Sequence, residues 1–342
     1  MTGSLEGPWG PIPIVDSIQA RKDRMGTLMV RLGLGRMGYT VIPGLYGIGS
    51  PDSSSPVFVT ANYKLSFDHL RRNLAGVNGW ILVLNTKGIN VWCAAGKGTF
   101  GTAELMKRIY ECKLPDLLEH RRLIVPQLGA PGVSAFKVKK ETGFSVDFGP
   151  VMAEDLPAYL NAGGKATREM RLKHFPLEER LVLVPVELVN VLKIFVFIAP
   201  VLFLFGGLAD PSHYLDAALD QGVGLFILFL YGIAGGAIIT PALLPVLPGR
   251  AFALKGGVAG ILLAVFVALA TNFPVSEKLH LYDLAADVFI ITAVSSYLGM
   301  QFTGASTYTS LSGVKKEMLF SIPVQIFLLT AGLLSWYLAN TT

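Results

Sequence analysis

Apolar and polar residues alternate in one way over the first half of the chain and in another over the second half. From residue 56 onward, short apolar runs alternate with amphipathic stretches. Residues 80–85 are almost continuously apolar, as expected for a strand buried on both faces of a sheet. Residues 65–74 and 102–112 repeat their apolar positions with a helical period. This alternation predicts an α/β domain with a Rossmann-like parallel sheet over residues 56–163.

The same pattern assigns the other elements of the first half. Strands are expected at 57–62, 80–85, 123–126 and 144–148, and helices at 65–74, 102–112, 132–140 and 153–161. Residues 1–55 are rich in Gly, Pro and Ser and are expected to form an irregular segment, with one short helix around 16–32. Residues 164–187 are basic and amphipathic and are expected to link this domain to a membrane surface.

Five long apolar runs follow residue 187. They lie near residues 188–209, 223–247, 256–273, 284–304 and 319–339. Each approaches the ~20 residues that a helix needs to cross ~30 Å of hydrocarbon. Residues 188–342 are therefore predicted to form an all-α transmembrane domain of five helices.

The charges predict how that domain is oriented. Residues 1–187 carry 23 of the 29 Lys and Arg residues and 17 of the 24 Asp and Glu residues. Basic loops alternate with neutral or acidic ones, and basic loops stay in the cytoplasm. The N-terminal domain is thus expected in the cytoplasm and the C-terminus outside a multi-pass inner membrane. The loop charges are Asp210, Asp216 and Asp220; then Arg250 and Lys255; then Glu277, Lys278 and Asp283; then Lys315 and Lys316.

Composition excludes several kinds of site. The two cysteines, Cys93 and Cys112, are too few for a four-cysteine iron–sulfur cluster or a structural zinc site. Basic patches interleaved with aromatic residues are absent, so nucleic acid is not expected as a partner. Residues 96–101 match the spacing G-x-G-x-x-G, but a loop separates them from the preceding strand. Lys97 is followed by Gly98 rather than Ser or Thr, which excludes a P-loop.

Cys93 is the residue with the clearest chemical potential. It follows a buried strand, where a helix is expected to begin. Gly96 and Gly98 lack side chains, so a flat, bulky molecule could approach the backbone there. The residues alone leave three interpretations open: a ligand of a soft metal, a nucleophile, or a small buried cysteine in a glycine-rich turn. Cys112, on the expected helix 102–112, is interpreted as structural.

The run NVWCAAGKGTFGT resembles the corrinoid-binding domain of the corrinoid iron–sulfur proteins of the acetyl-CoA pathway. It resembles more closely the mercury-methylation corrinoid proteins of the HgcA family. The signature of that family is Asn, Val or Ile, Trp, Cys, Ala, Ala or Gly, Gly, Lys, and residues 90–97 match it at every position. Its architecture, a cytoplasmic corrinoid domain followed by five spans, matches as well. This chain departs from the acetyl-CoA pathway proteins in lacking cysteines for an iron–sulfur cluster of its own.

The resemblance implies a cofactor and its contacts. The cofactor would be cobalamin or a related corrinoid, with residues 92–101 as a cap helix under the corrin ring. Cys93 would be the lower axial ligand of the cobalt and the catalytic residue. The implied contacts to the corrinoid are Thr60, Asn90, Val91, Trp92, Cys93, Ala94, Ala95, Gly96 and Lys97, with further contacts from Gln127, Phe148 and Gly149.

The resemblance also implies a reaction and its partners. The reaction would be transfer of a methyl group from Cys-ligated methylcobalamin to Hg(II), giving methylmercury. The implied partners are a ferredoxin-like iron–sulfur protein of the HgcB type as electron donor, a methyl-folate or methyl-pterin donor system, Hg(II) thiolate complexes and the lipid bilayer. Two alternatives are a membrane-bound corrinoid methyl carrier of C1 metabolism with a nucleophilic acceptor, and a membrane transporter with a regulatory Rossmann-like domain.

Overall fold

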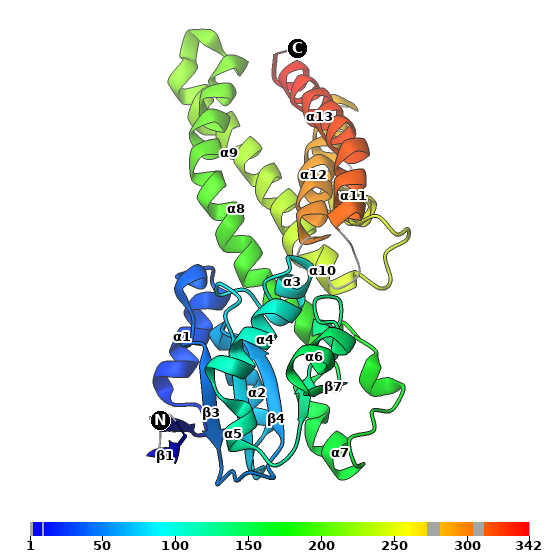
Figure 1. Cartoon of the computed structure of the whole chain (residues 1–342). Coiled ribbons are helices and arrows are strands. Elements are labelled where there is room, and N and C mark those ends of the chain that lie inside the picture. Colours follow the sequence, from blue (N-terminus) through cyan, green and yellow to red (C-terminus); the bar gives the residue numbers. More distant parts are fainter. Residues whose placement is uncertain (1–2, 9, 272–280, 304–310, 342) are drawn as a thin grey trace. The chain divides into compact units, whose positions relative to one another are not determined.

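The computed structural model describes residues 3–8, 10–271, 281–303 and 311–341 (Figure 1). The chain divides into two compact units. The N-terminal unit comprises residues 1–30 and 34–174, and the helical unit comprises residues 31–33 and 175–342. The predicted fold class, an α/β domain followed by a helical domain with five apolar helices, is confirmed.

A seven-stranded sheet forms the centre of the N-terminal unit, in the order β1-β2-β3-β5-β4-β6-β7. Strands β4, β5, β6 and β7 are parallel to one another, as the sequence predicts. The sheet as a whole is mixed, because β3 runs antiparallel to β5 and β1 antiparallel to β2. The strands are β1 (Gly3–Gly7), β2 (Gly10–Val15), β3 (Gly44–Ile48), β4 (Val57–Ala61), β5 (Gly79–Leu84), β6 (Arg122–Val125) and β7 (Ser145–Phe148).

The prediction that residues 1–55 are irregular is wrong, because they supply three of these strands. The prolines of this segment led to the prediction of irregular structure, because proline is rare inside strands. Pro11 and Pro13 lie in β2 opposite β1, and the pairing of β2 with β3 begins only at Ile14. A proline has no N–H to donate, so it is tolerated where a strand is paired on one side only. The short helix expected around 16–32 is present as α1 (Arg21–Arg31).

Helices cover both faces of the sheet. On one face, Phe58, Ile81 and Val83 pack against α2 (Lys64–Asn73) and α7 (Leu156–Asn161). On the other face, Val59, Leu82 and Leu84 share a core with α3 to α6. The strand residues alternate between the two cores because successive side chains point to opposite faces. The helices of this second face are α3 (Val91–Gly96), α4 (Thr102–Glu111), α5 (Leu114–Leu117) and α6 (Ala135–Thr142); the short 3-10 turns are η1 (Arg36–Gly38), η2 (Gln127–Gly129), η3 (Ala153–Asp155) and η4 (Glu169–Arg171).

The order of the strands creates a switch point at one edge of the sheet. The chain runs from β4 through α2 to the neighbouring β5, and then crosses back over β4 to reach β6 on its other side. The loops after β4 and β6 therefore lead to opposite faces. In open α/β sheets, ligands bind outside the carboxyl ends of the strands at such a point.

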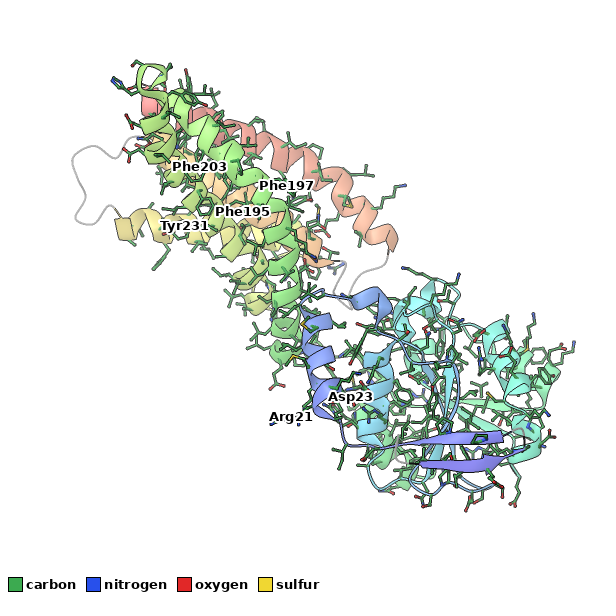
Figure 2. All side chains as sticks on the ribbon, turned by 90° about the vertical axis from the view of Figure 1, so that its left-hand side faces the viewer. Arg21, Asp23, Phe195, Phe197, Phe203 and Tyr231 are labelled. Atoms are coloured by element: carbon green, nitrogen blue, oxygen red, sulfur yellow. The ribbon has the colours of Figure 1, made fainter. Side chains whose placement is uncertain are left out.

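A buried ionic network holds α1 against α2. Asp68 is 1% exposed and accepts from Lys64 Nζ at 2.5 Å and from Arg71 Nε at 2.8 Å. Asp23, on α1 (Figure 2), accepts from the same two side chains at 2.7 Å each. Burial raises the pKa of Asp23, but the hydrogen bond and charge of Lys64, with further hydrogen bonds from the Ala20 amide and from Arg71, outweigh burial and lower the pKa. Its contribution to stability is therefore present at neutral pH and is lost as the pH falls through the lowered pKa.

Among the described residues, the helical unit has five helices long and apolar enough to cross a membrane: Leu177–Ala209, Pro211–Leu243, Phe252–Ala270, Leu281–Phe302 and Gly313–Thr341. This agrees with the five predicted spans. The first helix, however, begins at Leu177, within the segment expected as a linker. Lys278 and Glu277, used to predict the orientation, lie outside the described residues, as do residues 272–273 and 304 at the predicted span ends.

The spans include α8 (Leu177–Gly206), α9 (Tyr214–Ile233), a π-helical segment η7 (Ala234–Ile239), α10 (Thr240–Leu243), α11 (Phe252–Thr271), α12 (Leu281–Phe302) and α13 (Leu311–Thr341). Glycines allow α11 and α12 to pack backbone against backbone. A Cβ added to Gly256 would lie 2.4 Å from the carbonyl oxygen of Ser295, and one added to Gly299 would lie 2.9 Å from the Gly256 Cα. Small residues permit such close approach between helices in a membrane.

Replacing Asp68 with Asn tests the ionic network. The change keeps the shape of the side chain but leaves Lys64 and Arg71 with Asp23 as their only carboxylate in the network. We expect the free energy of unfolding of the N-terminal unit to fall by about 2 to 3 kcal/mol, somewhat less than when a buried ion pair is fully broken. Pulse proteolysis of the full chain in urea measures this. The matched control is Asp116→Asn, at an exposed aspartate; an equal loss in both variants would contradict the prediction.

Candidate functional site

The thiol of Cys93 is exposed on a short helix at the carboxyl edge of the sheet. Cys93 is the third residue of α3, which follows β5 (Figure 1). Asn90 caps this helix, its Oδ1 accepting from the Cys93 amide at 2.9 Å. Ala94 and Ala95 are buried in the core that α3 shares with α4. The buried alanines hold the helix to the domain, while Cys93 faces outward.

One buried side chain fixes the loop that leads into α3. Asn62, directly after β4, is 6% exposed. Its Oδ1 accepts from the backbone amides of Thr86 and Gly88, both at 3.0 Å, and the Thr86 hydroxyl lies 2.9 Å away. Because a buried amide without a partner is costly, this oxygen determines where the chain turns after β5.

The turn itself uses left-handed backbone conformations. Lys87 has φ 57° and Gly88 has φ 72°. Two successive residues of this kind reverse the chain sharply, and a non-glycine residue such as Lys87 adopts this conformation only at a cost. The Thr86 hydroxyl also lies 2.6 Å from the Ile89 carbonyl, across the turn. The start of α3, and with it Cys93, is thus set from β4 through Asn62.

Two glycines leave the surface beside Cys93 open. A Cβ added to Gly96 or Gly98 would meet no atom within 4 Å. Gly98 has φ +78°, which ends the helical path. The prediction that residues 92–101 form one cap helix is therefore wrong: α3 ends at Gly96, and α4 begins at Thr102.

The loop after β6 approaches this segment from the other side of the switch point. A Cβ added to Gly132 would lie 2.1 Å from the Phe100 carbonyl oxygen and 3.1 Å from the Ala95 Cα. Only glycine fits there. In addition, α3 contacts both η2, after β6, and strand β4. Cys93 therefore stands on a helix that contacts both β4 and the turn that follows β6.

The structure brings most of the predicted contact residues to this edge. Val91 and Trp92 are half-buried at the start of α3, and Lys97 is exposed at its end. Gln127 lies in η2, where its Oε1 accepts from Arg171 at 2.5 Å. Phe148 packs against the α3 core, and the Gly149 amide donates to the Val125 carbonyl at 2.9 Å.

Thr60 is placed differently. It lies in β4 with a side chain only 3% exposed. Strand alternation puts it on the face of Phe58, which is covered by α2 and α7 rather than by α3. Its contact with a cofactor, like those of the other residues, stays a prediction. The functional residues that the sequence reasoning missed are Asn62 and Thr86, which hold the turn.

The side chains available as metal ligands restrict which kind of metal could bind at Cys93. Within the described part of the chain, no group of three or more His, Cys, Asp or Glu side chains could hold a metal ion. A metal at Cys93 would therefore have to bring most of its ligands with it. Cobalt in a corrin ring does so, because the macrocycle supplies four nitrogen donors and leaves axial positions free. The exposed sulfur and the open surface at Gly96 and Gly98 fit such a group.

Cys112, unlike Cys93, does not present an exposed thiol. It is buried at the end of α4, 6% exposed. Burial raises the pKa of its thiol to about 11, with a further rise from Glu111 that Arg108 opposes. The thiol is therefore protonated at neutral pH, which agrees with the structural role predicted for it.

Comparisons with known proteins match the same part of the chain. A family model described as the CO dehydrogenase/acetyl-CoA synthase delta subunit (CdhD) matches residues 20–160. The acetyl-CoA decarbonylase/synthase complex subunit gamma of Archaeoglobus fulgidus is 34% identical over 122 residues, 35% of this chain and 26% of that protein. The subunit gamma of Methanopyrus kandleri is 35% identical over 126 residues, 36% of this chain and 27% of that protein.

The chain thus spans about a quarter of the length of these relatives. The similarity supports the resemblance to the corrinoid proteins of the acetyl-CoA pathway and agrees with the cobalt corrinoid predicted as cofactor. It covers the α/β unit. It does not address mercury methylation.

Replacing Asn62 with Leu tests the role of its side-chain oxygen. The variant leaves the amides of Thr86 and Gly88 buried without an acceptor, so the free energy of local opening over residues 86–96 should fall by about 2 to 4 kcal/mol. Hydrogen exchange of this segment in the full chain measures the change. Asn62→Asp retains the acceptor and should keep most of the protection. Equal loss of protection in both variants would show that the oxygen is not the fixing group.

Proposed function

We propose that the N-terminal unit binds a cobalt corrinoid over α3 and that the protein is a corrinoid-dependent methyltransferase. The observation that carries the proposal is the exposed Cys93 thiol beside the open surface of Gly96 and Gly98, at the switch point of the sheet. The similarity of residues 20–160 to proteins of acetyl-CoA synthesis supports it independently.

In this proposal, Cys93 would ligate the cobalt, and the residues around it would hold it in place. Asn90 caps the helix, Ala94 and Ala95 anchor it, and Asn62 fixes the turn before it. Asn90, Val91, Trp92 and the small residues that follow would contact the corrin. When bound, the corrinoid supplies the methyl group, and a strongly donating thiolate ligand favours its transfer to an electrophile.

We infer Hg(II), delivered as a thiolate complex, as that electrophilic acceptor, giving methylmercury. Two observations favour it. Residues 90–97 match the mercury-methylation signature at every position. A soft sulfur donor on the cobalt also suits an acceptor that needs a methyl group with carbanion character. Cys112, the other cysteine, is buried, so it is not available to capture Hg(II) together with Cys93.

The second candidate is a membrane-bound methyl carrier of C1 metabolism with a nucleophilic acceptor. The comparisons favour it over mercury methylation, since the relatives are named as subunits of acetyl-CoA decarbonylase/synthase complexes. A carrier of this kind does not need a thiolate on the cobalt. The two candidates therefore share one site and differ in what Cys93 contributes to it.

The proposal includes partners and a location. Two cysteines are too few for a four-cysteine iron–sulfur cluster, so we expect electrons from a separate ferredoxin-like protein and methyl groups from a methyl-folate or methyl-pterin system. The five apolar helices support a multi-pass membrane protein. From the loop charges we propose that the N-terminal unit lies in the cytoplasm and the C-terminus outside.

The cobalt absorption spectrum tests ligation by Cys93. The full chain reconstituted with cobalamin should give a spectrum distinct from the base-on and water-ligated forms, because sulfur is a stronger donor. Cys93→Ala should abolish that spectrum, and Cys112→Ala, at the buried cysteine, should retain it. Identical spectra for the unmodified chain and Cys93→Ala would contradict ligation by Cys93.

Methyl transfer by Cys93→Thr separates the two candidate acceptors. If Hg(II) is the acceptor, its methylation should fall at least about 100-fold in this variant, equivalent to about 2.7 kcal/mol of transition-state stabilisation. Product methylmercury and a methylated thiol are measured in parallel assays. Undiminished transfer to the thiol, with little transfer to Hg(II) by the unmodified chain, would favour the carrier of C1 metabolism.

Replacing Gly96 with Leu tests the open surface. A Cβ meets nothing there, so the chain should fold normally, while the larger side chain occupies the space assigned to the corrin. We expect cobalamin binding to weaken at least about tenfold. The matched control is Gly224→Leu, at a glycine of α9 whose Cβ position is equally open. Unchanged cobalamin affinity in Gly96→Leu would exclude α3 as the binding surface.

A further inference from the structure

The outer face of α1 is apolar although it is exposed. Met25, Leu28 and Met29 are spaced three and four residues apart, so they lie on one side of the helix. Their exposed fractions are 60%, 52% and 43%. A helix on the surface of a soluble domain ordinarily turns its apolar side inward and its charges outward. This helix does the reverse, so its outer face is suited to surroundings other than water.

The inner face of α1 is held by polar contacts. Asp23 accepts from Lys64 and Arg71 in the ionic network, and its backbone carbonyl accepts from the Tyr39 hydroxyl at 3.2 Å. Gly26, three residues on, lies against the same tyrosine, since an added Cβ would lie 2.6 Å from the Tyr39 hydroxyl oxygen. These contacts fix which side of the helix faces the domain. The exposure of the apolar side is therefore a consequence of how α1 is packed.

Basic side chains surround the apolar ones. Residues 18–36 contain five Lys or Arg residues and one acidic residue, Asp23, which faces inward. Lys22 and Arg24 are exposed on the two flanks of the apolar stripe, and Arg21 (Figure 2) is exposed one turn before Met25. The outer face of α1 therefore carries positive charge alone.

The surroundings of α1 extend this combination. Ile18, just before the helix, is 75% exposed. A groove of about 520 Å³ runs beside α1, and its lining combines the apolar side chains of Met25 and Met29 with the charged ones of Arg21 and Lys22. Apolar and cationic groups therefore meet their surroundings at the same place. A phospholipid, with an anionic head and an apolar body, complements both.

From these observations we propose that the outer face of α1 lies on the surface of a bilayer that contains anionic lipids. Its three apolar side chains would enter the boundary between headgroups and acyl chains, and its basic side chains would bind lipid phosphates. Basic helices with one apolar side bind membrane surfaces in this way. Each Lys or Arg near an anionic leaflet adds to the attraction.

The chain itself keeps a bilayer close to this unit. The N-terminal unit ends at residue 174, and the first apolar span begins at Leu177. A unit tethered so closely to a span meets the membrane surface at a high effective concentration, so a weak interfacial affinity is sufficient. The proposal rests on the membrane location proposed above and does not involve the corrinoid.

Nitroxide labels on the full chain in nanodiscs test this. All labelled chains carry Cys93→Ala, which leaves the buried Cys112 as the only native thiol. One label is placed at Met25→Cys, and the matched control at Lys107→Cys, an exposed position of α4. Collisions with oxygen, which concentrates among acyl chains, and with a water-soluble nickel chelate give the depth of each label.

The depth should depend on the lipid. In equal parts of phosphatidylglycerol and phosphatidylcholine, we expect the label at residue 25 to lie about 5 to 10 Å within the boundary of headgroups and acyl chains, and the label at residue 107 to lie in water. In phosphatidylcholine alone, the label at residue 25 should lie nearer to water, because that surface has no net charge. Equal depth in the two lipids would overturn the assignment to anionic lipid. A label shielded from both oxygen and the chelate would show that protein covers α1, which also overturns it.

A label on a span separates this inference from the membrane location on which it rests. Phe197 of α8 (Figure 2) is 78% exposed, and a label at Phe197→Cys should report acyl chains in both lipids. If that label reports acyl chains while the one at residue 25 reports water, the inference about α1 fails and the membrane location stands. Water at residue 197 would overturn the membrane location and this inference with it.

Charge variants show whether the basic side chains of α1 make the contact. Lys22→Gln combined with Arg24→Gln removes two exposed charges from α1, so the label at residue 25 should move toward water in the phosphatidylglycerol mixture. The matched control, Lys107→Gln combined with Lys139→Gln, removes the same charge from α4 and α6 and should leave the depth unchanged. Equal shifts in the two pairs would assign the effect to net charge and overturn the role of α1.

Variants of the apolar stripe test the other half of the contact. Leu28→Gln combined with Met29→Gln should also move the label at residue 25 toward water, because both side chains are exposed and their loss removes apolar surface from the contact. The control is Phe136→Gln, at an 81% exposed phenylalanine of α6, and it should leave the depth unchanged. An unchanged depth in the α1 variant would contradict insertion of the stripe.

Discussion

The side-chain oxygen of Asn62 is the group on which the geometry of the candidate site depends. Strands β4 and β5 end side by side, and the chain must leave β5, turn and begin α3 within a few residues. The amides of that turn are buried and need an acceptor other than the sheet. Asn62 supplies one from β4 and carries no charge that would itself need a partner. Any displacement of its oxygen would move Asn90 and, with it, Cys93.

The two units obtain their rigidity in different ways. In the N-terminal unit, hydrogen bonds to Asn62 fix the turn after β5 at the carboxyl edge of the sheet. Ion pairs hold α1 on α2, through the network of Asp23, Lys64, Asp68 and Arg71. In the helical unit, glycines bring α11 and α12 into backbone contact. Such packing needs few polar groups, and one that is buried between helices, Gln325 of α13, donates to the Ser296 hydroxyl of α12 at 3.0 Å.

Local pattern was enough to predict the strands at 80–85 and 57–62 and all five spans, because each is a long or continuous apolar run. It failed where pairing decides the structure. Pro11 and Pro13 make the sequence of β2 unlike that of a strand. The residues of β3 carry no pattern from which its antiparallel pairing with β5 could be predicted. The role of Asn62 depends on residues 24 and 26 positions away, although a polar residue directly after a buried strand was a usable signal. The hydrogen bond from Gln325 to Ser296 depends on contacts between helices, which hydropathy averages over.

The similarity to acetyl-CoA decarbonylase/synthase subunits and the match to the mercury-methylation signature concern different properties of one site. The first covers residues 20–160 and therefore the scaffold: the sheet, its switch point and the helices around it. The second concerns a single sulfur atom presented by that scaffold. A scaffold that leaves one face of a macrocycle open can serve either kind of methyl transfer. In the proposed function, Cys93 would donate electron density to the cobalt, so the choice between an electrophilic and a nucleophilic methyl acceptor would rest on Cys93 rather than on the fold.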